Sequence, residues 1–187
     1  DLPESLLEEY SDAAEKSLNY AEAFHLYLKL AQDERRREKL RSRMDRLIAH
    51  RDSFYHIMGH LSETIVMQNE EVLKHFPLFY YKLGTRVYHE GNLKAAKRWL
   101  EILKTHHTAF LRSDFFLGMI SMHEGEPQEA LKHFESALAH EDPKPMQCHA
   151  LLGEISFDQG DFEGARRHYI KVFQSGKNTR ESLEYLF

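Results

Sequence analysis

His56, His60 and Glu63 have the spacing with which one face of a helix can present ligands to a metal ion. Imidazole and carboxylate groups at such positions suit zinc and other ions that bind imidazole. The chain has 13 histidines, however, so chance can produce the same spacing, and no glutamate directly follows His56 to complete the metalloprotease motif. Gly59, between the two histidines, instead suggests a closely packed neighbouring helix. The sequence therefore predicts no metal site. His56, His60 and Glu63 are the one weak candidate for metal ligands.

Other reactive side chains have ordinary structural explanations. The pair His106-His107 falls at the end of an expected helix, where imidazole interacts favourably with the helix dipole. Cys148 is the single cysteine, which excludes an internal disulfide, and its apolar neighbours predict a small buried side chain. The sequence contains no phosphate-cradling glycine loop, nucleophile elbow or Cys/His catalytic arrangement. We therefore predict that the protein is not an enzyme and uses no cofactor.

Basic residues crowd the expected helix between Asp33 and Arg51 and could contact the phosphates of a nucleic acid. Three acidic residues, Glu34, Glu38 and Asp45, alternate with them and would form ion pairs along the helix. The formal charge of -5 and the pI near 6.2 give no general reason to expect a polyanionic partner. We interpret the basic stripe as a solvated helix face and keep nucleic-acid contact as the alternative. The stripe consists of Arg35, Arg36, Arg37, Lys39, Arg41, Arg43 and Arg46.

Three similar units follow one another between Tyr80 and Asn178. Each contains a Leu-Gly pair, a second glycine followed by a residue that suits a helix start, and an alanine. The Leu-Gly pairs recur 34 and 35 positions apart, and a period of about 34 residues with two helical patterns indicates a helix-turn-helix solenoid. The landmarks are Leu83-Gly84, Gly91-Asn92-Leu93 and Ala96, then Leu117-Gly118, Gly125-Glu126-Pro127 and Ala130, then Leu152-Gly153, Gly160-Asp161-Phe162 and Ala165.

Each landmark has a physical role. The first glycine lies inside a helix, where it costs about 1 kcal/mol relative to alanine, so its repeated use predicts that another helix packs closely there. The second glycine is expected to end this helix with a positive φ. The residue after it suits the first turn of the second helix, and the alanine is expected where the two helices cross.

These units resemble the tetratricopeptide repeat (TPR) family between Pro77 and Asn178. The resemblance implies an all-α, right-handed α-solenoid in which successive first helices line a concave groove that binds a peptide or a partner helix. Apolar and aromatic groove residues suit an amphipathic helix or an apolar peptide. No cation stands where some family members clamp the carboxylate of a chaperone tail. The resemblance places in the groove Leu78, Tyr81, Thr85, Tyr88, Arg112, Phe115, Met119, Met122, Gln147, Ala150, Glu154 and Phe157.

The whole chain divides into three expected regions, all helical. Residues 1–76 hold a degenerate opening repeat and a diverged or inserted helix pair, whose second helix runs from Ser53 to Phe76 and breaks near Gln68-Asn69. Residues 77–178 hold the three repeats. Residues 179–187 start a capping helix or a further repeat, because the last unit of a solenoid has an apolar face that needs covering.

The sequence thus predicts a non-catalytic scaffold or adaptor that binds another protein and can be a member of a larger complex. The alternative is a regulatory or substrate-docking module of a larger enzyme or secretion assembly whose catalytic part lies outside this fragment. The chain's own N-terminal helices could also fill the groove. No stretch reaches the roughly 20 apolar residues of a membrane span, so we expect a soluble protein, in the cytoplasm or in a bacterial periplasm.

Overall fold

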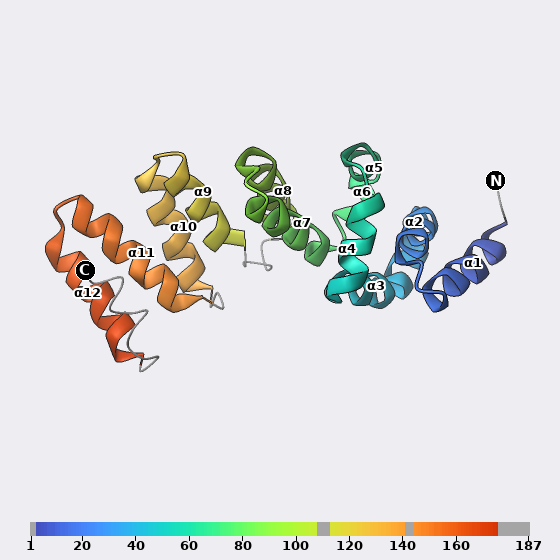
Figure 1. The fold of residues 1–187 in the computed structure, drawn as a ribbon, viewed down its shortest axis with the longest axis horizontal. Helices are drawn as coiled ribbons and strands as arrows, with labels where there is room; N and C mark the ends of the chain where they lie inside the picture. Colours follow the sequence, from blue (N-terminus) through green and yellow to red (C-terminus); the bar gives the residue numbers. More distant parts are fainter. Residues whose placement is uncertain (1–2, 108–112, 141–143, 176–187) are drawn as a thin grey trace. The chain divides into compact units, whose positions relative to one another are not determined.

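The computed structural model describes residues 3–107, 113–140 and 144–175, which form twelve α-helices and no β-strand (Figure 1). The all-α fold predicted from the repeats is therefore confirmed. The predicted capping segment, residues 179–187, lies outside the described residues. No described helix is long and apolar enough to cross a membrane. The helices are α1 (Glu4–Lys16), α2 (Tyr20–Leu30), α3 (Glu34–Ala49), α4 (Arg51–His60), α5 (Glu63–Gln68), α6 (Glu70–Leu73), α7 (Pro77–His89), α8 (Leu93–His106), α9 (Asp114–His123), α10 (Pro127–Ala139), α11 (Pro145–Asp158) and α12 (Phe162–Gln174).

The chain forms two compact units, residues 1–83 and residues 84–187, and the division falls within α7. In the first unit α2 packs against α1, α3 and α4. The rings of Phe24 and Phe79 stack there, with their centroids 5.7 Å apart. Helix α3 buries one narrow apolar stripe, whose residues recur at three-and-four spacing along the sequence. The stripe consists of Leu40, Met44, Leu47 and Ile48.

The region predicted as one helix from Ser53 to Phe76 consists instead of α4, α5 and α6. The break predicted near Asn69 is confirmed. The break at Leu61 and Ser62 was missed, and there the Ser62 side chain accepts a hydrogen bond from the Ile65 amide and starts α5. The close packing predicted at Gly59 was wrong, because no heavy atom of a neighbour lies within 4 Å of the place where its Cβ would stand.

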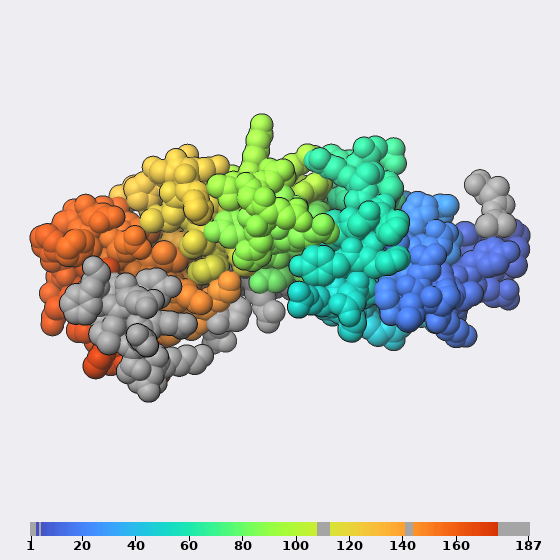
Figure 2. All heavy atoms as spheres, viewed as in Figure 1, coloured from blue at the N-terminus to red at the C-terminus, as the bar shows by residue number. Residues whose placement is uncertain are grey.

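The close packing predicted at the three Leu-Gly pairs is confirmed. A Cβ on Gly118 would lie 2.6 Å from the ring of Phe134, and one on Gly153 would lie 2.6 Å from the ring of Tyr169. The same holds in the first repeat, where a Cβ on Gly84 would lie 2.7 Å from Leu100. Helix α9 therefore packs closely on α10 at Gly118, and α11 packs closely on α12 at Gly153. Consecutive helices from α9 to α12, coloured yellow to orange, form a continuous surface (Figure 2).

The turns between paired helices also follow the sequence. The second glycine of each repeat has a positive φ, of 84°, 74° and 78° in chain order. The side chains of Asn92 and Asp161 accept hydrogen bonds from the amides of Ala95 and Gly164 and so cap α8 and α12. Helix α10 lacks such a side-chain bond and begins with a proline in its first turn instead.

Candidate functional site

The predicted groove residues that the structure describes lie on α7, α9 and α11. In the first unit, Leu78 and Tyr81 of α7 are half-buried. In the second unit four of the predicted residues are half-buried, two are buried and three are exposed, and Arg112 lies outside the described residues. The half-buried ones are Thr85, Tyr88, Met119 and Met122, the buried ones Phe115 and Ala150, and the exposed ones Gln147, Glu154 and Phe157.

An aromatic cluster forms around Phe116 in the second unit. The Tyr88 ring meets the Phe116 ring edge-to-face, with the centroids 5.4 Å apart, and burial raises the pKa of the Tyr88 phenol. The centroid of the His123 ring lies 6.3 Å from that of Tyr88. The Lys144 ammonium stands 4.4 Å from the ring centroids of both Phe115 and Phe116. The cluster therefore combines aromatic surface with one cation.

The sequence did not single out Lys144 or His123 for this surface. Lys144 belongs to the turn before α11, where the 34-residue period gains its extra residue. A repeat period places helix faces well but does not give the path of a turn, so only the structure brings this lysine over the two phenylalanine rings. Phe115 is covered by Phe116, Phe134 and Lys144, and it adds little open surface to a groove.

Asp114, at the start of α9, is fully buried and holds three helices together. Its carboxylate accepts hydrogen bonds from Lys104 Nζ of α8 at 2.7 Å, from His133 Nδ1 of α10 at 2.9 Å and from Ser136 Oγ of α10 at 2.6 Å. Burial by itself would raise the pKa of Asp114, but these hydrogen bonds outweigh burial and lower the pKa to about 2. Because the Asp114 carboxylate is buried and its hydrogen-bond donors come from α8 and α10, we interpret it as a structural link between α8, α9 and α10.

Two histidine rings, one from α11 and one from α12, meet between these helices. His149 Nδ1 and His168 Nδ1 are 3.1 Å apart, close enough for one neutral ring to donate to the other. Burial lowers the pKa of both imidazoles, and the positive charges of Lys171 and Arg167 lower them further. The pair is therefore a neutral hydrogen-bonded contact between two helices.

The structure gives His56 and His60 other contacts. The Ala21 amide donates to His56 Nδ1 at 3.3 Å, and His60 Nδ1 donates to the His56 carbonyl at 2.9 Å. Glu63 stands beyond the break at Leu61, at the start of α5. Among the described residues, no group of three or more His, Cys, Asp or Glu side chains could hold a metal ion.

The basic stripe of α3 is largely paired within the first unit. Arg36 contacts Glu8 of α1 at 2.5 Å, Arg46 contacts Glu15 of α1 at 2.6 Å, and Arg43 contacts Asp12 of α1. The intrahelical pairs predicted with Glu34 and Glu38 are also present, to Arg37 and Arg41. The ion pair predicted with Asp45 was wrong, because Asp45 Oδ1 is buried without a hydrogen-bond partner among the described residues. The sequence missed the pairs with α1, which fix one helix to another.

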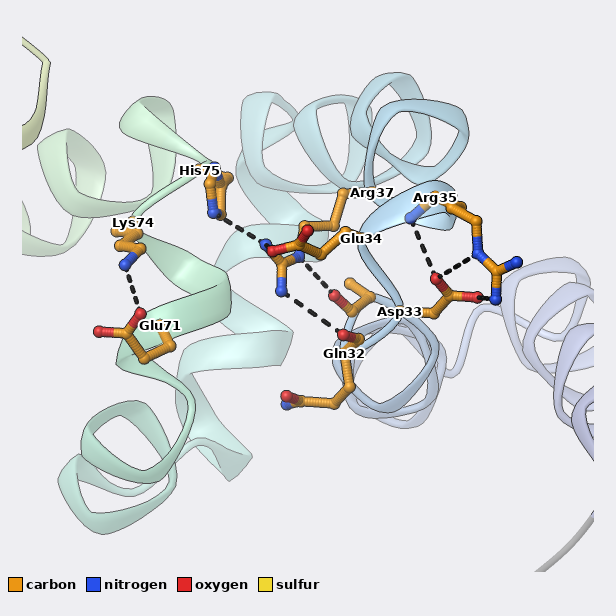
Figure 3. Close-up of polar contacts among 9 residues, drawn as sticks. Gln32, Asp33, Glu34, Arg35, Arg37, Glu71, Lys74 and His75 are labelled. Carbon is orange, nitrogen blue, oxygen red and sulfur yellow. Dashed lines mark hydrogen bonds and ion pairs between the residues drawn. The ribbon is translucent and has the colours of Figure 1, made fainter.

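Figure 3 shows how the first residues of α3 are held. Asp33 caps the helix by accepting from the Arg35 amide at 3.0 Å and also pairs with the Arg35 guanidinium. The Arg37 guanidinium donates to the backbone carbonyl of Gln32 and lies 3.1 Å from the His75 ring nitrogen (Figure 3). These contacts pair the guanidinium groups of Arg35 and Arg37 with groups of the protein itself, which leaves less of the stripe for phosphate groups.

Comparisons with known proteins give a structural likeness only. No protein-family model matches the chain, and no curated protein matches it. Among solved structures, a MamA double mutant from strain RS-1 is similar with a TM-score of 0.56 and 18% identity over 91% of this chain and 93% of that one. MamA from AMB-1 has a TM-score of 0.56 and 15% identity over 97% of this chain and 96% of that one. The chain shares the helical-repeat fold of MamA.

A third structure, MamA 41-end from Desulfovibrio magneticus RS-1, has a TM-score of 0.54 and 17% identity over 94% of this chain and 97% of that one. MamA has a TPR-like helical-repeat fold, so the likeness agrees with the α-solenoid predicted from the three glycine-marked units. At such identities a backbone is shared while surface side chains differ, so the likeness to MamA establishes the fold and no binding residue.

Proposed function

We propose that the protein is a non-catalytic scaffold that binds an amphipathic helix or an apolar peptide of another protein along the predicted groove face. The observation that carries the proposal is a recurrence at one repeat position. Tyr88, Met122 and Phe157 occupy equivalent places in the three repeats, 34 and 35 positions apart. Each is large and apolar, and each keeps exposed surface: Tyr88 and Met122 are half-buried and Phe157 is 55% exposed.

Such a row suits a helical ligand for a physical reason. An amphipathic helix presents apolar side chains at three-and-four spacing, and a few large anchors in apolar pockets supply most of the binding energy. The methionine in the row can adjust its shape to the ligand, since its side chain is unbranched and polarizable. The Lys144 cation beside this surface would favour a ligand with an acidic residue next to its apolar face.

The test compares this row with an equally exposed aromatic residue elsewhere. A photo-crosslinking amino acid placed at Met122 is expected to capture a partner in lysate, whereas the same group at Tyr55, which is 53% exposed on α4, is not. The triple change Tyr88→Ala, Met122→Ala and Phe157→Ala should lower affinity for a peptide from the captured partner by roughly 100-fold, since anchor residues contribute about 1 kcal/mol or more each. Tyr55→Ala is the control and should leave this affinity unchanged.

Both variants must first be shown to be folded by circular dichroism. If the folded triple variant binds the peptide as tightly as the unaltered protein, partner binding through this row is wrong. If a partner is crosslinked only when the photo-crosslinking amino acid is at Tyr55, the binding site lies in the first unit.

A further inference from the structure

Helix α1 packs into the first unit with little apolar burial. None of the apolar side chains that the structure describes in α1 is buried: Leu6 and Leu7 are half-buried and Tyr10 is 50% exposed. The next helix, α2, has six buried residues. Because burial of apolar surface supplies most of the free energy that holds a helix in place, α1 can leave its position at a lower cost than α2.

Charged side chains join α1 to α3 instead. Three carboxylates of α1 follow one another at spacings of four and three residues, so they share one side of the helix. They pair with three arginines of α3: Glu8 with Arg36, Asp12 with Arg43 and Glu15 with Arg46. By sequence, α1 has five acidic residues and one lysine, a formal charge of -4, and α3 has seven basic and three acidic residues, a formal charge of +4. The contact is therefore an acidic helix against a basic one.

Helix α2 adds a neutral donor to this contact. The hydroxyl of the fully buried Tyr27 donates to Glu15 Oε2 at 2.6 Å, and Arg43 donates to the Tyr27 oxygen at 3.4 Å. Burial and the Glu15 carboxylate raise the pKa of the Tyr27 phenol, which keeps the hydroxyl protonated. A buried donor without an acceptor is unfavourable, so this position favours a carboxylate. We call the guanidinium groups of Arg36, Arg43 and Arg46, with the Tyr27 hydroxyl, the arginine face.

The arginine face can be reached from solvent. Arg43 and Arg46 line a hollow of about 420 Å³ together with Asp12, Glu15 and Lys16 of α1. The side chain of Arg46 is 64% exposed and that of Arg43 is 43% exposed. Exposed ion pairs of this kind are individually weak and are screened by salt, so a competing carboxylate can replace one supplied by α1.

The connection between α1 and α2 has an unusual backbone. It consists of Ser17, Leu18 and Asn19. Among the described residues, Leu18 is the one residue other than glycine with a positive φ, of 62°. A bulky side chain disfavours this left-handed conformation, and that of Leu18 is 63% exposed. Release of α1 would let Leu18 return to an ordinary backbone conformation, so the strain at this connection favours release.

We propose that the arginine face is a binding site for an acidic amphipathic helix of another protein, and that α1 is the built-in occupant that such a helix displaces. Carboxylates at helical spacing match the arginine face as α1 does. A nucleic acid fits less well, because Glu34 and Glu38 of α3 would repel its phosphates. The site belongs to the first unit and is independent of the proposed groove row of Tyr88, Met122 and Phe157.

A peptide tests the site directly. The probe is a fluorescently labelled synthetic peptide with the sequence of residues 3–18, which carries the α1 carboxylates at their natural spacing. The full-length triple variant Glu8→Gln, Asp12→Asn and Glu15→Gln weakens the built-in occupant and leaves the arginine face intact. A tethered α1 competes at a high effective concentration, so we expect the triple variant to bind the peptide about 10-fold more tightly than the unaltered protein. Added salt should weaken this binding.

Two further variants show whether the arginine face is the binding surface. Adding Arg43→Gln and Arg46→Gln to the triple variant should lower the affinity for the peptide by about 10-fold. Arg41→Gln is the matched control, because Arg41 of α3 contacts Glu38 and the His75 carbonyl and no residue of α1. It should leave the affinity unchanged.

The triple variant must first be shown to be folded by circular dichroism. A folded triple variant that binds the peptide no more tightly than the unaltered protein would show that α1 is a fixed part of the fold. Tighter binding of a single-stranded RNA oligonucleotide than of the peptide would assign the arginine face to phosphates. Mixed dimers of the triple variant and the unaltered chain, detected by light scattering, would make a second copy the occupant. Each of these three results overturns the proposal.

Hydrogen exchange of the unaltered protein tests the release of α1 without any substitution. Raising the salt concentration from about 0.05 M to about 0.5 M screens the ion pairs between α1 and α3. The amides of α1 should then exchange several-fold faster, whereas those of α2, with its six buried residues, should keep their rates. Exchange rates of α1 that do not respond to salt would contradict the proposal.

Discussion

Lys104 Nζ lies 2.7 Å from Oδ1 of the buried Asp114, so the last turn of α8 is joined to the first turn of α9 by a charged hydrogen bond. His133 and Ser136 of α10 bind the same carboxylate. This contact links the first repeat to the second, and its partners come from three helices. The single tryptophan, Trp99, is buried in α8, so its fluorescence reports on the second unit.

Asp114→Asn should destabilise the second unit at neutral pH and remove part of its acid sensitivity. The pKa of Asp114 is about 2 in the folded protein against an ordinary 3.8. Because the folded pKa is the lower one, the ionised carboxylate contributes about 2 kcal/mol of stability at neutral pH, and this contribution is lost as the pH falls below about 4. Urea denaturation followed by Trp99 fluorescence should show a steeper loss between pH 6 and pH 2 in the unaltered protein than in the variant. Parallel pH curves would contradict the prediction.

Gly118→Ala should lower the free energy of unfolding by about 1 to 3 kcal/mol, because the new methyl group meets a buried ring. The ring of Phe134 is fully buried and would lie 2.6 Å from the added Cβ. Gly59→Ala is the matched control, since that helical glycine has open space around it. It should be neutral or stabilising by up to about 1 kcal/mol through helix propensity. Equal effects of the two changes would argue against close packing at Gly118.

Gly160→Ala should destabilise the turn between α11 and α12 by about 1 kcal/mol, because its φ of 78° lies in the left-handed region. No neighbouring atom lies within 4 Å of an added Cβ there, so the cost is in the backbone and not in packing. Gly160→Asn should recover part of the loss, since asparagine tolerates this conformation better. Thermal denaturation of both variants tests this, and an asparagine variant less stable than the alanine variant would refute the backbone explanation.

His149→Gln should make the packing of α11 on α12 less sensitive to acid. The pKa values of His149 and His168 are lowered by burial and by neighbouring positive charge, so the folded state favours neutral rings. Their contribution to stability is complete above the ordinary histidine pKa of 6.5 and is lost as the pH falls through the lower folded values. We expect the melting temperature of the unaltered protein to drop more than that of the variant between pH 7.5 and pH 5. His123→Gln, which replaces an exposed histidine of α9, should retain the full drop.

The sequence by itself determined the local structure of the repeats. The glycines that follow α7, α9 and α11 have positive φ, a left-handed backbone conformation that glycine adopts at the lowest cost, so a single glycine in each repeat predicts the turn. Gly118 and Gly153 were predictable as close contacts because each recurs in register with a large residue of the paired helix. The apolar stripe of α3 was predictable from the three-and-four spacing of its residues alone.

Only the tertiary structure decided which side chains meet across helices. Three sets of contacts depend on the paths of the turns between helices. They are the hydrogen bonds of the Asp114 carboxylate, the Lys144 ammonium over Phe115 and Phe116, and the ion pairs of α3 with α1. A period fixes where a helix begins and which side is apolar. It does not determine how one helix is rotated against the next, or which groups a long charged side chain can contact. These two features decide which polar side chains of this protein meet.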